Sequence, residues 1–284
     1  MKSVIFVADL FINDYVGGAE LTTEALLEAS PDTLEVRKLH CQALTQEIAD
    51  ENKDAHWVIC NFATLKDDIK TYFCKNMDYS IIEYDYKFCK YRSLEKHTAA
   101  TKGECDCLTT LSGKINTAFY AYAHKTWFMS DAQREIFLSK IKHIKAEKCE
   151  TLSSIFSEGD LRFINSIKDN EKDGNYLIIG SDSWIKGVAD SIKFAEDNNL
   201  EYEVVRGIPY PELLIKMSTS RGLLFHPLGS DTCPRTTIEA KLLGCDLILN
   251  DYVQHKDEDW FSTPQRCNEY MLSRPSTFWE HYEQ

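Results

Sequence analysis

Long hydrophobic runs are missing from this sequence of 284 residues. No apolar stretch approaches the roughly 18–20 residues that a membrane-spanning helix needs, so we expect no transmembrane segment. The N-terminal run Val4–Ala8 stops at Asp9 and is too short for the core of a signal peptide.

Positive charge is also outnumbered by negative charge. The chain has 32 Lys and Arg residues against 45 Asp and Glu residues, a formal net charge of −13. This balance argues against a globally basic nucleic-acid-binding protein. A disordered chain is excluded too, because 43% of the residues are apolar and 27% are charged.

Disulfide-rich and zinc-finger patterns are also lacking. The ten cysteines are too sparse for a disulfide scaffold, and most lie in apolar runs, as Cys60 and Cys245 do. We therefore expect reduced thiols in a cytoplasmic protein. Cys105 and Cys107 form the one tight pair, but no second pair or histidine partner stands at the usual spacing of a zinc site. The sequence therefore predicts no metal site.

Short apolar segments rich in β-branched and aromatic residues alternate with amphipathic segments. This alternation predicts βαβ units and an α/β fold with parallel sheets buried on both faces. Strands are expected at 3–8, 33–39, 56–60, 79–84, 126–129, 175–180, 201–205, 222–226 and 246–250, and helices at 19–29, 132–144, 187–197 and 235–243.

The polar segment 167–174 divides the chain into two parts, each of which begins a new strand–helix series. We therefore expect two α/β domains, residues 1–168 and 169–284, with a cleft between them. A C-terminal helix is expected at 276–283, with Pro275 at its start because proline fits the first turn of a helix. This helix is expected to pack back toward the N-terminal domain.

The dinucleotide-binding pattern G-x-G-x-x-G is absent, yet Gly17 and Gly18 stand between the first expected strand and its helix. Glycines there allow a ligand to approach the backbone, and N–H groups at a helix N-terminus suit a phosphate or sugar oxygen. A plain tight turn also explains these residues.

Two further loops, both in the second half, carry residues suited to a charged ligand. In the loop 180–187, Lys186 can place its ammonium group on a diphosphate at the start of a helix. In a later loop Asp231 precedes Pro234, which fits the first turn of a helix, and Glu239 follows within that helix. The two carboxylates can accept hydrogen bonds from ring hydroxyls. An exposed lysine on a loop is the alternative for the first of these loops, and a solvated N-terminal turn with favourable acids is the alternative for the second.

In order and spacing, the segment 176–251 resembles the nucleotide-sugar domain of GT-B glycosyltransferases, in particular the retaining family-4-type enzymes. The matching motifs are Ile185-Lys186-Gly187, Arg206-Gly207-Ile208-Pro209, Asp231-x7-Glu239-Ala240 and Leu243-Gly244-Cys245. The resemblance implies a GT-B fold of two Rossmann-like domains facing a central cleft, and a hexosyltransferase-like activity.

The resemblance also implies residue roles. Lys186 neutralises the donor diphosphate, Glu239 binds the nucleotide ribose and Asp231 holds donor-sugar hydroxyls. The other implied donor-binding residues are Gly17, Gly18, Ser181, Arg206, Gly207, Ile208, Thr232, Cys233, Pro234 and Arg235. Enzymes of this type use a UDP- or GDP-sugar as substrate and need no metal and no other cofactor.

The sequence departs from the family pattern in two places. Asp231 stands where the family has a longer glutamate, which bears on sugar selectivity. The phosphate-binding arginine usually found five residues before the lysine is replaced by Ser181, and Arg235 is a candidate substitute.

The sequence signals for an acceptor-binding site are less specific than those for the donor site. Asp85 follows an expected strand, at the sheet edge where ligands of parallel sheets bind. The segment 86–103 carries the basic residues Lys87, Lys90, Arg92, Lys96 and Lys102 against Glu95 alone, with the aromatic residues Tyr86, Phe88 and Tyr91 interleaved. Such a segment suits an anionic acceptor, namely an acidic glycan, a phosphorylated carrier or nucleic acid. A solvated basic loop is the simpler alternative.

The expected function is metal-independent transfer of a sugar from a nucleotide-diphosphate donor to an acceptor hydroxyl, with retention of anomeric configuration. Two alternatives stay open. One is a virus-type enzyme that glycosylates a modified DNA base, and the other is a nucleotide-sugar-binding module without catalysis.

Overall fold

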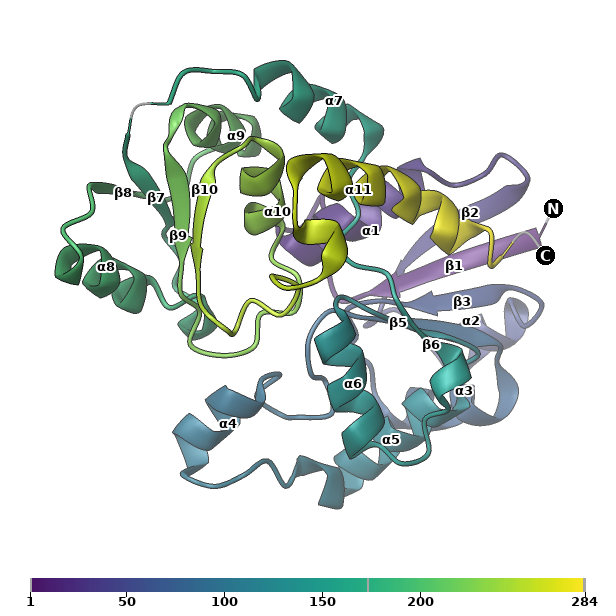
Figure 1. Cartoon of the computed structure of the whole chain (residues 1–284). Coiled ribbons are helices and arrows are strands. Elements are labelled where there is room, and N and C mark those ends of the chain that lie inside the picture. The colour runs from purple at the N-terminus through teal and green to yellow at the C-terminus, as the bar shows by residue number, and fades with distance from the viewer. Residues whose placement is uncertain (1, 173, 283–284) are drawn as a thin grey trace. The chain divides into compact units, whose positions relative to one another are not determined.

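The computed structural model describes residues 2–172 and 174–282 and has the expected α/β architecture (Figure 1). The chain forms two compact units. One comprises the residues up to Ile155 together with those from Arg274 onward, and the other comprises Phe156–Ser273. Each unit contains one parallel sheet covered by helices.

The first unit is built around a six-stranded parallel sheet with the strand order β2-β1-β3-β4-β5-β6. Its strands are β1 (Lys2–Ala8), β2 (Leu34–His40), β3 (His56–Ile59), β4 (Tyr79–Glu83), β5 (Thr126–Phe128) and β6 (Cys149–Thr151). Its α-helices are α1 (Gly18–Glu28), α2 (Gln46–Glu51), α3 (Asp67–Asn76), α4 (Leu94–Thr101), α5 (Leu111–Tyr122) and α6 (Asp131–Lys140). The strand order reverses between β1 and β3, as in doubly wound folds.

Alternate side chains of β1 enter the core on opposite faces of this sheet. Ile5 belongs to a buried cluster that includes Phe73 of α3. Phe6 instead packs against Trp279, with the two ring centroids 5.8 Å apart. Because successive side chains of a strand point to opposite faces, a strand buried on both faces needs an unbroken apolar run, which β1 has.

The second unit contains a four-stranded parallel sheet with the order β10-β9-β7-β8. Its strands are β7 (Tyr176–Ile179), β8 (Tyr202–Val205), β9 (Gly222–Phe225) and β10 (Asp246–Leu249). Its α-helices are α7 (Glu158–Ile167), α8 (Val188–Asp197), α9 (Tyr210–Thr219) and α10 (Arg235–Leu242), and α11 (Pro264–Trp279) begins in this unit.

The division between the units differs from the expected one at 168/169. Helix α7 packs against α9 and α10 and buries Leu161 and Ile164, so it belongs to the second unit. The polar segment 167–174 is therefore a connection inside the second unit rather than a linker between the two.

All nine expected strands are present, and the four expected helices are found as α1, α6, α8 and α10. Strand β6 was not expected, because a three-residue strand at the sheet edge with the sequence Cys-Glu-Thr carries no apolar run. Among the described residues, no helix combines the length and the apolar character that crossing a membrane requires.

The start expected for the C-terminal helix is wrong. Helix α11 begins at Pro264, after Thr263, whose Oγ1 accepts a hydrogen bond from the backbone N–H of Arg266 at 3.2 Å. Pro275 lies inside the helix, and residue 283 of the expected range lies outside the described residues. The expected packing is confirmed, since Trp279 Nε1 donates to the backbone oxygen of Leu26 at 2.9 Å.

Candidate functional site

The strand order of the second unit identifies one edge of its sheet as the place for a ligand. Its first strand, β7, pairs with β8 on one side and with β9 on the other. In open parallel sheets, ligands bind beyond the carboxyl ends of the strands at the point where the strand order reverses. The loops that follow β7 and β9 meet at this point, and they carry Lys186 and Asp231.

Lys186 and Asp231 are in direct contact. Lys186 Nζ lies 2.7 Å from Asp231 Oδ2 and 5.5 Å from the centroid of the Phe225 ring. The two loops are also joined through the backbone, since the N–H of Leu228 donates to the oxygen of Ile185 at 2.9 Å. The side chain of Lys186 is 36% exposed and that of Asp231 is 13% exposed, so the ammonium group is open to a ligand while the carboxylate is more enclosed.

Gly187 allows the two loops to come this close. It has a φ of 55°, in the left-handed region, and a Cβ atom at this position would stand 2.0 Å from the backbone oxygen of His226. Only glycine fits such a conformation and such an approach. Gly187 therefore sets the direction in which the preceding residue, Lys186, leaves the backbone.

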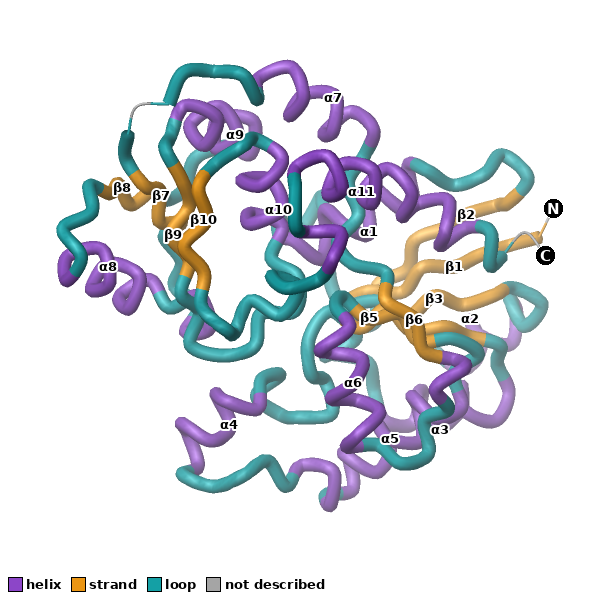
Figure 2. Tube along the Cα trace, in the orientation of Figure 1, coloured by secondary structure: helices purple, strands orange, loops and turns teal. Residues whose placement is uncertain are grey.

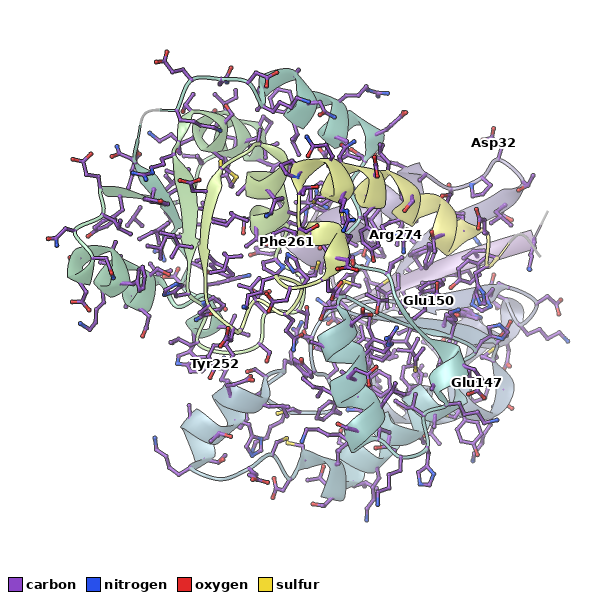
Figure 3. The ribbon with its side chains drawn as sticks, in the orientation of Figure 1. Asp32, Glu147, Glu150, Tyr252, Phe261 and Arg274 are labelled. Carbon is purple, nitrogen blue, oxygen red and sulfur yellow. The ribbon has the colours of Figure 1, made fainter. Side chains whose placement is uncertain are left out.

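The backbone of Asp231 is bound to the loop that follows β10, on which Tyr252 lies (Figure 3). The N–H of Asp231 donates to the oxygen of Tyr252 at 2.8 Å, and the oxygen of Asp231 accepts from the N–H of Gln254 at 3.1 Å. With its backbone bonded on both sides, Asp231 presents its carboxylate from a defined position.

Glu239, in α10, is almost fully buried, with 1% of its surface exposed. Its Oε1 accepts a hydrogen bond from the Tyr210 hydroxyl at 2.8 Å and lies 3.6 Å from Arg235 Nε. Its Oε2 has no hydrogen-bond partner within 2–172 and 174–282. Burial raises the pKa of Glu239, and Arg235 and the Tyr210 hydroxyl oppose that shift. A buried carboxylate oxygen without a donor is suited to a ligand hydroxyl.

The surroundings of Arg235 do not favour the expected role as a substitute phosphate clamp. Its side chain is 3% exposed, and besides Glu239 it contacts Asp160 Oδ2 at 3.3 Å. Its guanidinium lies 3.8 Å from the centroid of the Phe156 ring. The charge of Arg235 is therefore directed at two carboxylates and an aromatic ring within its own unit. Helix geometry explains this, since residues 235 and 239 are one turn apart on the same face.

The helices that begin at the expected site share a feature, the lack of a capping side chain. Gly17 caps α1, Gly187 caps α8 and Pro234 caps α10, and none of them makes a side-chain cap bond. By contrast α2, α4, α5, α6 and α7 begin with capping Ser or Thr side chains. The first N–H groups of an uncapped helix suit a ligand anion, although α3 and α9 also lack such a cap.

The other expected donor residues of the second unit lie on three loops: Ser181 follows β7, Arg206, Gly207 and Ile208 follow β8, and Thr232, Cys233 and Pro234 follow β9. Arg206 donates to Asp182 Oδ1 at 2.8 Å, and Ser181 Oγ accepts from the N–H of Ser183 at 3.1 Å. Gly207 has a φ of 68°, Ile208 is 36% exposed, and Thr232 and Cys233 are buried beside Pro234.

In the first unit, Gly17 and Gly18 open α1 after β1, as expected. The backbone angle of Gly17 does not call for glycine, since its φ is −132°. A Cβ atom there would lie 2.6 Å from both Glu20 Oε2 and Tyr15 Cε1.

The basic segment that follows β4 exposes Lys90, Arg92, Lys96 and Lys102, but two of its cations are paired with carboxylates. Lys87 is buried and bonds to Glu83 at 2.9 Å and to Asp85 at 3.3 Å. Arg92 Nε donates to Asp85 Oδ2 at 2.6 Å. Of the four residues expected on the acceptor side, only Lys90 and Arg92 are exposed.

A small cavity nevertheless adjoins this segment. It has a volume of about 230 Å³ and is lined in part by Lys70, Lys87, Lys90 and Arg92. Two of the interleaved aromatic residues, Tyr86 and Phe88, are 0% and 2% exposed, so they cannot stack on nucleic-acid bases. The expectation of an aromatic nucleic-acid surface is therefore wrong for these two residues.

No protein-family model matches the sequence, and no curated protein sequence does. Solved structures match the whole chain. Anabaena HepE, in complex with UDP and glucose, is 10% identical with a TM-score of 0.57, and the match covers 100% of this chain and 98% of HepE. An α,α-trehalose-phosphate synthase (UDP-forming) from Burkholderia vietnamiensis is 9% identical with a TM-score of 0.56, covering 99% and 98%. AviGT4, a glycosyltransferase involved in avilamycin A biosynthesis, is 9% identical with a TM-score of 0.53, covering 99% and 96%.

The chain has the GT-B fold. The expected fold class is thereby confirmed. The confirmation rests on similarity of structure, because the sequence identity to these proteins is only 9–10%.

Sequence reasoning missed the residues of this GT-B chain that surround Glu239. Phe156 and Asp160 come from the start of α7 and Tyr210 from the start of α9, and no motif marks them. The one readable signal was the spacing of four between Arg235 and Glu239, which favours an ion pair within a helix.

Sequence reasoning also failed to find partners for Cys105 and Cys107. The structure brings Cys89 and His97 to them. These two residues stand well before the pair and at none of the usual zinc-finger spacings.

Proposed function

We propose that this chain transfers a sugar from a nucleoside-diphosphate sugar to an acceptor hydroxyl, and that the donor binds at the carboxyl edge of the second sheet. The observation that carries the proposal is the meeting of Lys186 and Asp231, 45 residues apart in sequence, where the strand order reverses. An ammonium group and a carboxylate placed side by side suit a ligand that joins a diphosphate to a polyhydroxylated ring.

The solved structures with the same fold support a nucleotide-sugar donor. HepE is in complex with UDP and glucose, and the Burkholderia synthase is described as UDP-forming. We therefore propose a UDP-sugar as the first donor to test and a GDP-sugar as the second.

In the proposed reaction the bond between the anomeric carbon and the diphosphate oxygen breaks, and its electron pair remains on the diphosphate. Lys186 and the N-terminal N–H groups of α8 and α10 stabilise the charge that develops there. The acceptor oxygen bonds to the anomeric carbon, and its proton passes to the leaving diphosphate. We propose retention of configuration, in keeping with the motif order that Lys186, Asp231 and Glu239 share with retaining enzymes.

Glu239 has a separate role in this proposal. Its Oε2, which lacks a donor among the described residues, accepts hydrogen bonds from the ribose hydroxyls of the donor. Arg235 and Tyr210 hold the carboxylate in place from the other side. We assign Arg235 to this positioning role rather than to the diphosphate.

The acceptor that we propose carries a negative charge outside the reacting hydroxyl. Its support is the cavity lined by Lys70, Lys87, Lys90 and Arg92. An acidic glycan or a phosphorylated carrier fits this proposal better than nucleic acid, because Tyr86 and Phe88 are buried. The proposed transfer needs no divalent metal at the diphosphate, since Lys186 and the helix N-termini supply positive charge there.

The test is release of nucleoside diphosphate from UDP-, GDP-, ADP- and CDP-sugars with a panel of acceptors and without added Mg²⁺ or Mn²⁺. One donor class is expected to turn over, and Lys186→Met is expected to reduce turnover at least about 100-fold. Lys193→Met is the matched control, because Lys193 is an exposed lysine of α8 that pairs only with Asp197 among the described residues. Binding of a donor without release of diphosphate would instead support the non-catalytic module, and equal turnover in the two variants would overturn the site.

A further inference from the structure

Four side chains between β4 and α5, in the first unit, gather into one cluster. The cluster consists of Cys89, His97, Cys105 and Cys107, and one potential ligand atom from each lies within 4.8 Å of every other. His97 Nδ1 is 3.5 Å from Cys89 Sγ and 3.5 Å from Cys107 Sγ. Cys89, His97 and Cys107 are buried and Cys105 is half-buried.

We propose that this cluster is a structural Zn²⁺ site with three cysteine ligands and one histidine ligand. Zinc binds thiolate sulfur at about 2.3 Å and imidazole nitrogen at about 2.0–2.1 Å in a tetrahedron, which separates neighbouring ligand atoms by about 3.5–3.8 Å. The two sulfur–nitrogen distances already have this value, and the remaining separations close by small rotations of the side chains.

The atoms around the cluster are arranged as zinc ligands require. His97 turns Nδ1 toward the sulfurs, and its Nε2 lies 3.8 Å from Asp106 Oδ1. A carboxylate near the second nitrogen orients a ligating imidazole. The backbone N–H of Lys90 donates to Cys107 Sγ at 3.5 Å, which stabilises a thiolate. The cationic residues of the segment 86–103 oppose the single negative charge of a site with three thiolates.

The segment that holds the cluster needs such a connection. Figure 2 shows α4 lying between two stretches of loop, and α4 and one short 3₁₀ turn are the only helical elements described between Glu83 and Leu111. Residues 98–104 are all exposed. A zinc ion would join both ends of this segment, because Cys89 lies near its start and Cys107 near its end.

The position of the cluster connects it to the proposed acceptor cavity. Cys89 and Cys107 line that cavity together with Lys87, Lys90 and Arg92. A zinc ion at this cluster would hold one wall of the proposed acceptor cavity. That role rests on the proposed function, whereas the proposal that the cluster binds zinc does not.

The test is the zinc content of the full chain, purified under reducing conditions and freed of any affinity tag, measured by mass spectrometry of the metal. The wild-type protein is expected to hold one zinc per chain. Cys107→Ser is expected to reduce this below about 0.1, whereas Cys41→Ser, a change at another buried cysteine of the first unit, is expected to retain it. The zinc measurement involves no donor and no acceptor, so its result does not depend on whether the chain is a transferase.

Two further measurements cover the case in which Cys107→Ser fails to fold. His97→Ala is expected to lose the zinc and His97→Cys to regain it, since four thiolates also form a tetrahedral site. Co²⁺ added to the chelated wild-type protein is expected to give the intense visible absorption of tetrahedral thiolate coordination. Wild-type protein without zinc that also gives no Co²⁺ absorption would overturn the proposal, as would equal zinc content in the Cys107 and Cys41 variants.

Discussion

Lys186 Nζ lies 2.7 Å from Asp231 Oδ2, although the two residues follow different strands of the second sheet. The ammonium group therefore already has a carboxylate partner before any ligand arrives. In the proposed function a diphosphate must share Lys186 with Asp231, while Asp231 turns to the sugar hydroxyls. Diphosphate binding and sugar binding are thus coupled through one ion pair.

This coupling predicts opposite effects of Asp231→Asn on binding and on transfer. Removing the carboxylate charge frees Lys186, so the affinity for the nucleoside diphosphate alone is expected to rise about threefold or more. Sugar transfer is expected to fall at least about tenfold, because the sugar hydroxyls lose a charged acceptor. Calorimetric titration and initial rates measure the two effects, and a parallel loss of both would contradict the shared role of Lys186.

Gly187 is expected to tolerate no side chain. In Gly187→Ala the new Cβ would stand 2.0 Å from the backbone oxygen of His226 at a positive φ. The free energy of unfolding is expected to fall by about 3 kcal/mol or more, the sum of backbone strain and overpacking.

The matched control is Gly244→Ala. Gly244 also has a positive φ, of 71°, but no atom lies within 4 Å of the new Cβ position among the described residues. Its cost is expected to be only the backbone strain, about 1–2 kcal/mol. Chemical denaturation compares the two variants, and equal losses would show that contact with His226 is not what requires glycine.

The buried pair of Arg235 and Glu239 predicts strongly non-additive mutations. Arg235→Met leaves the buried carboxylate without its cation and is expected to cost about 3–5 kcal/mol of stability. Adding Glu239→Gln removes that carboxylate charge, so the double variant is expected to be more stable than the sum of the single losses. Arg162→Met, which breaks an exposed pair with Glu158, is expected to have no measurable effect. Additive losses at 235 and 239 would contradict the pairing.

A pH dependence is expected from His255. This side chain is fully buried, and burial, aided by Lys241, lowers its pKa from 6.5 to about 3. Between pH 3 and pH 6.5, His255 is protonated in the unfolded chain but not in the folded chain. The contribution to stability is therefore complete above pH 6.5 and is lost as the pH falls toward 3, by up to about 1.4 kcal/mol per pH unit.

The variant His255→Phe tests this assignment. The free energy of unfolding, measured at several pH values between 7 and 4.5, is expected to fall less steeply with acid in the variant than in the wild-type protein. His143→Phe serves as the control, because His143 is exposed. An unchanged slope in the His255 variant would show that other groups cause the acid sensitivity.

Much of the fold could be predicted from local patterns. Strands buried on both faces need continuous apolar runs, and such runs located β1, β7 and β9. Because the carboxyl ends of parallel strands share one edge, the loops with Lys186 and Asp231 could be expected to meet. The match with the GT-B fold confirms the expected fold class.

The remainder depends on contacts between distant residues, which local patterns do not reveal. Charge alone suggested that Lys87 faces solvent, but Glu83 and Asp85 draw it into the core. Spacing alone suggested that Cys105 and Cys107 have no metal-binding partners. In the structure His97, which lies in α4, places its Nδ1 atom beside Cys107 Sγ. In both cases the contact depends on the three-dimensional course of the chain, which the spacing of residues in the sequence does not reveal.

The most direct test of the central claim compares the affinity of a nucleoside diphosphate with that of its 2′,3′-dideoxy analogue by calorimetric titration. The wild-type protein is expected to bind one of UDP, GDP, ADP and CDP, and to bind the dideoxy form at least about tenfold more weakly, because a buried carboxylate loses its ribose donors. In Glu239→Gln the two forms are expected to bind nearly alike. Failure of all four nucleotides to bind, or the same discrimination in the variant as in the wild-type protein, would contradict a nucleotide-sugar site at Glu239.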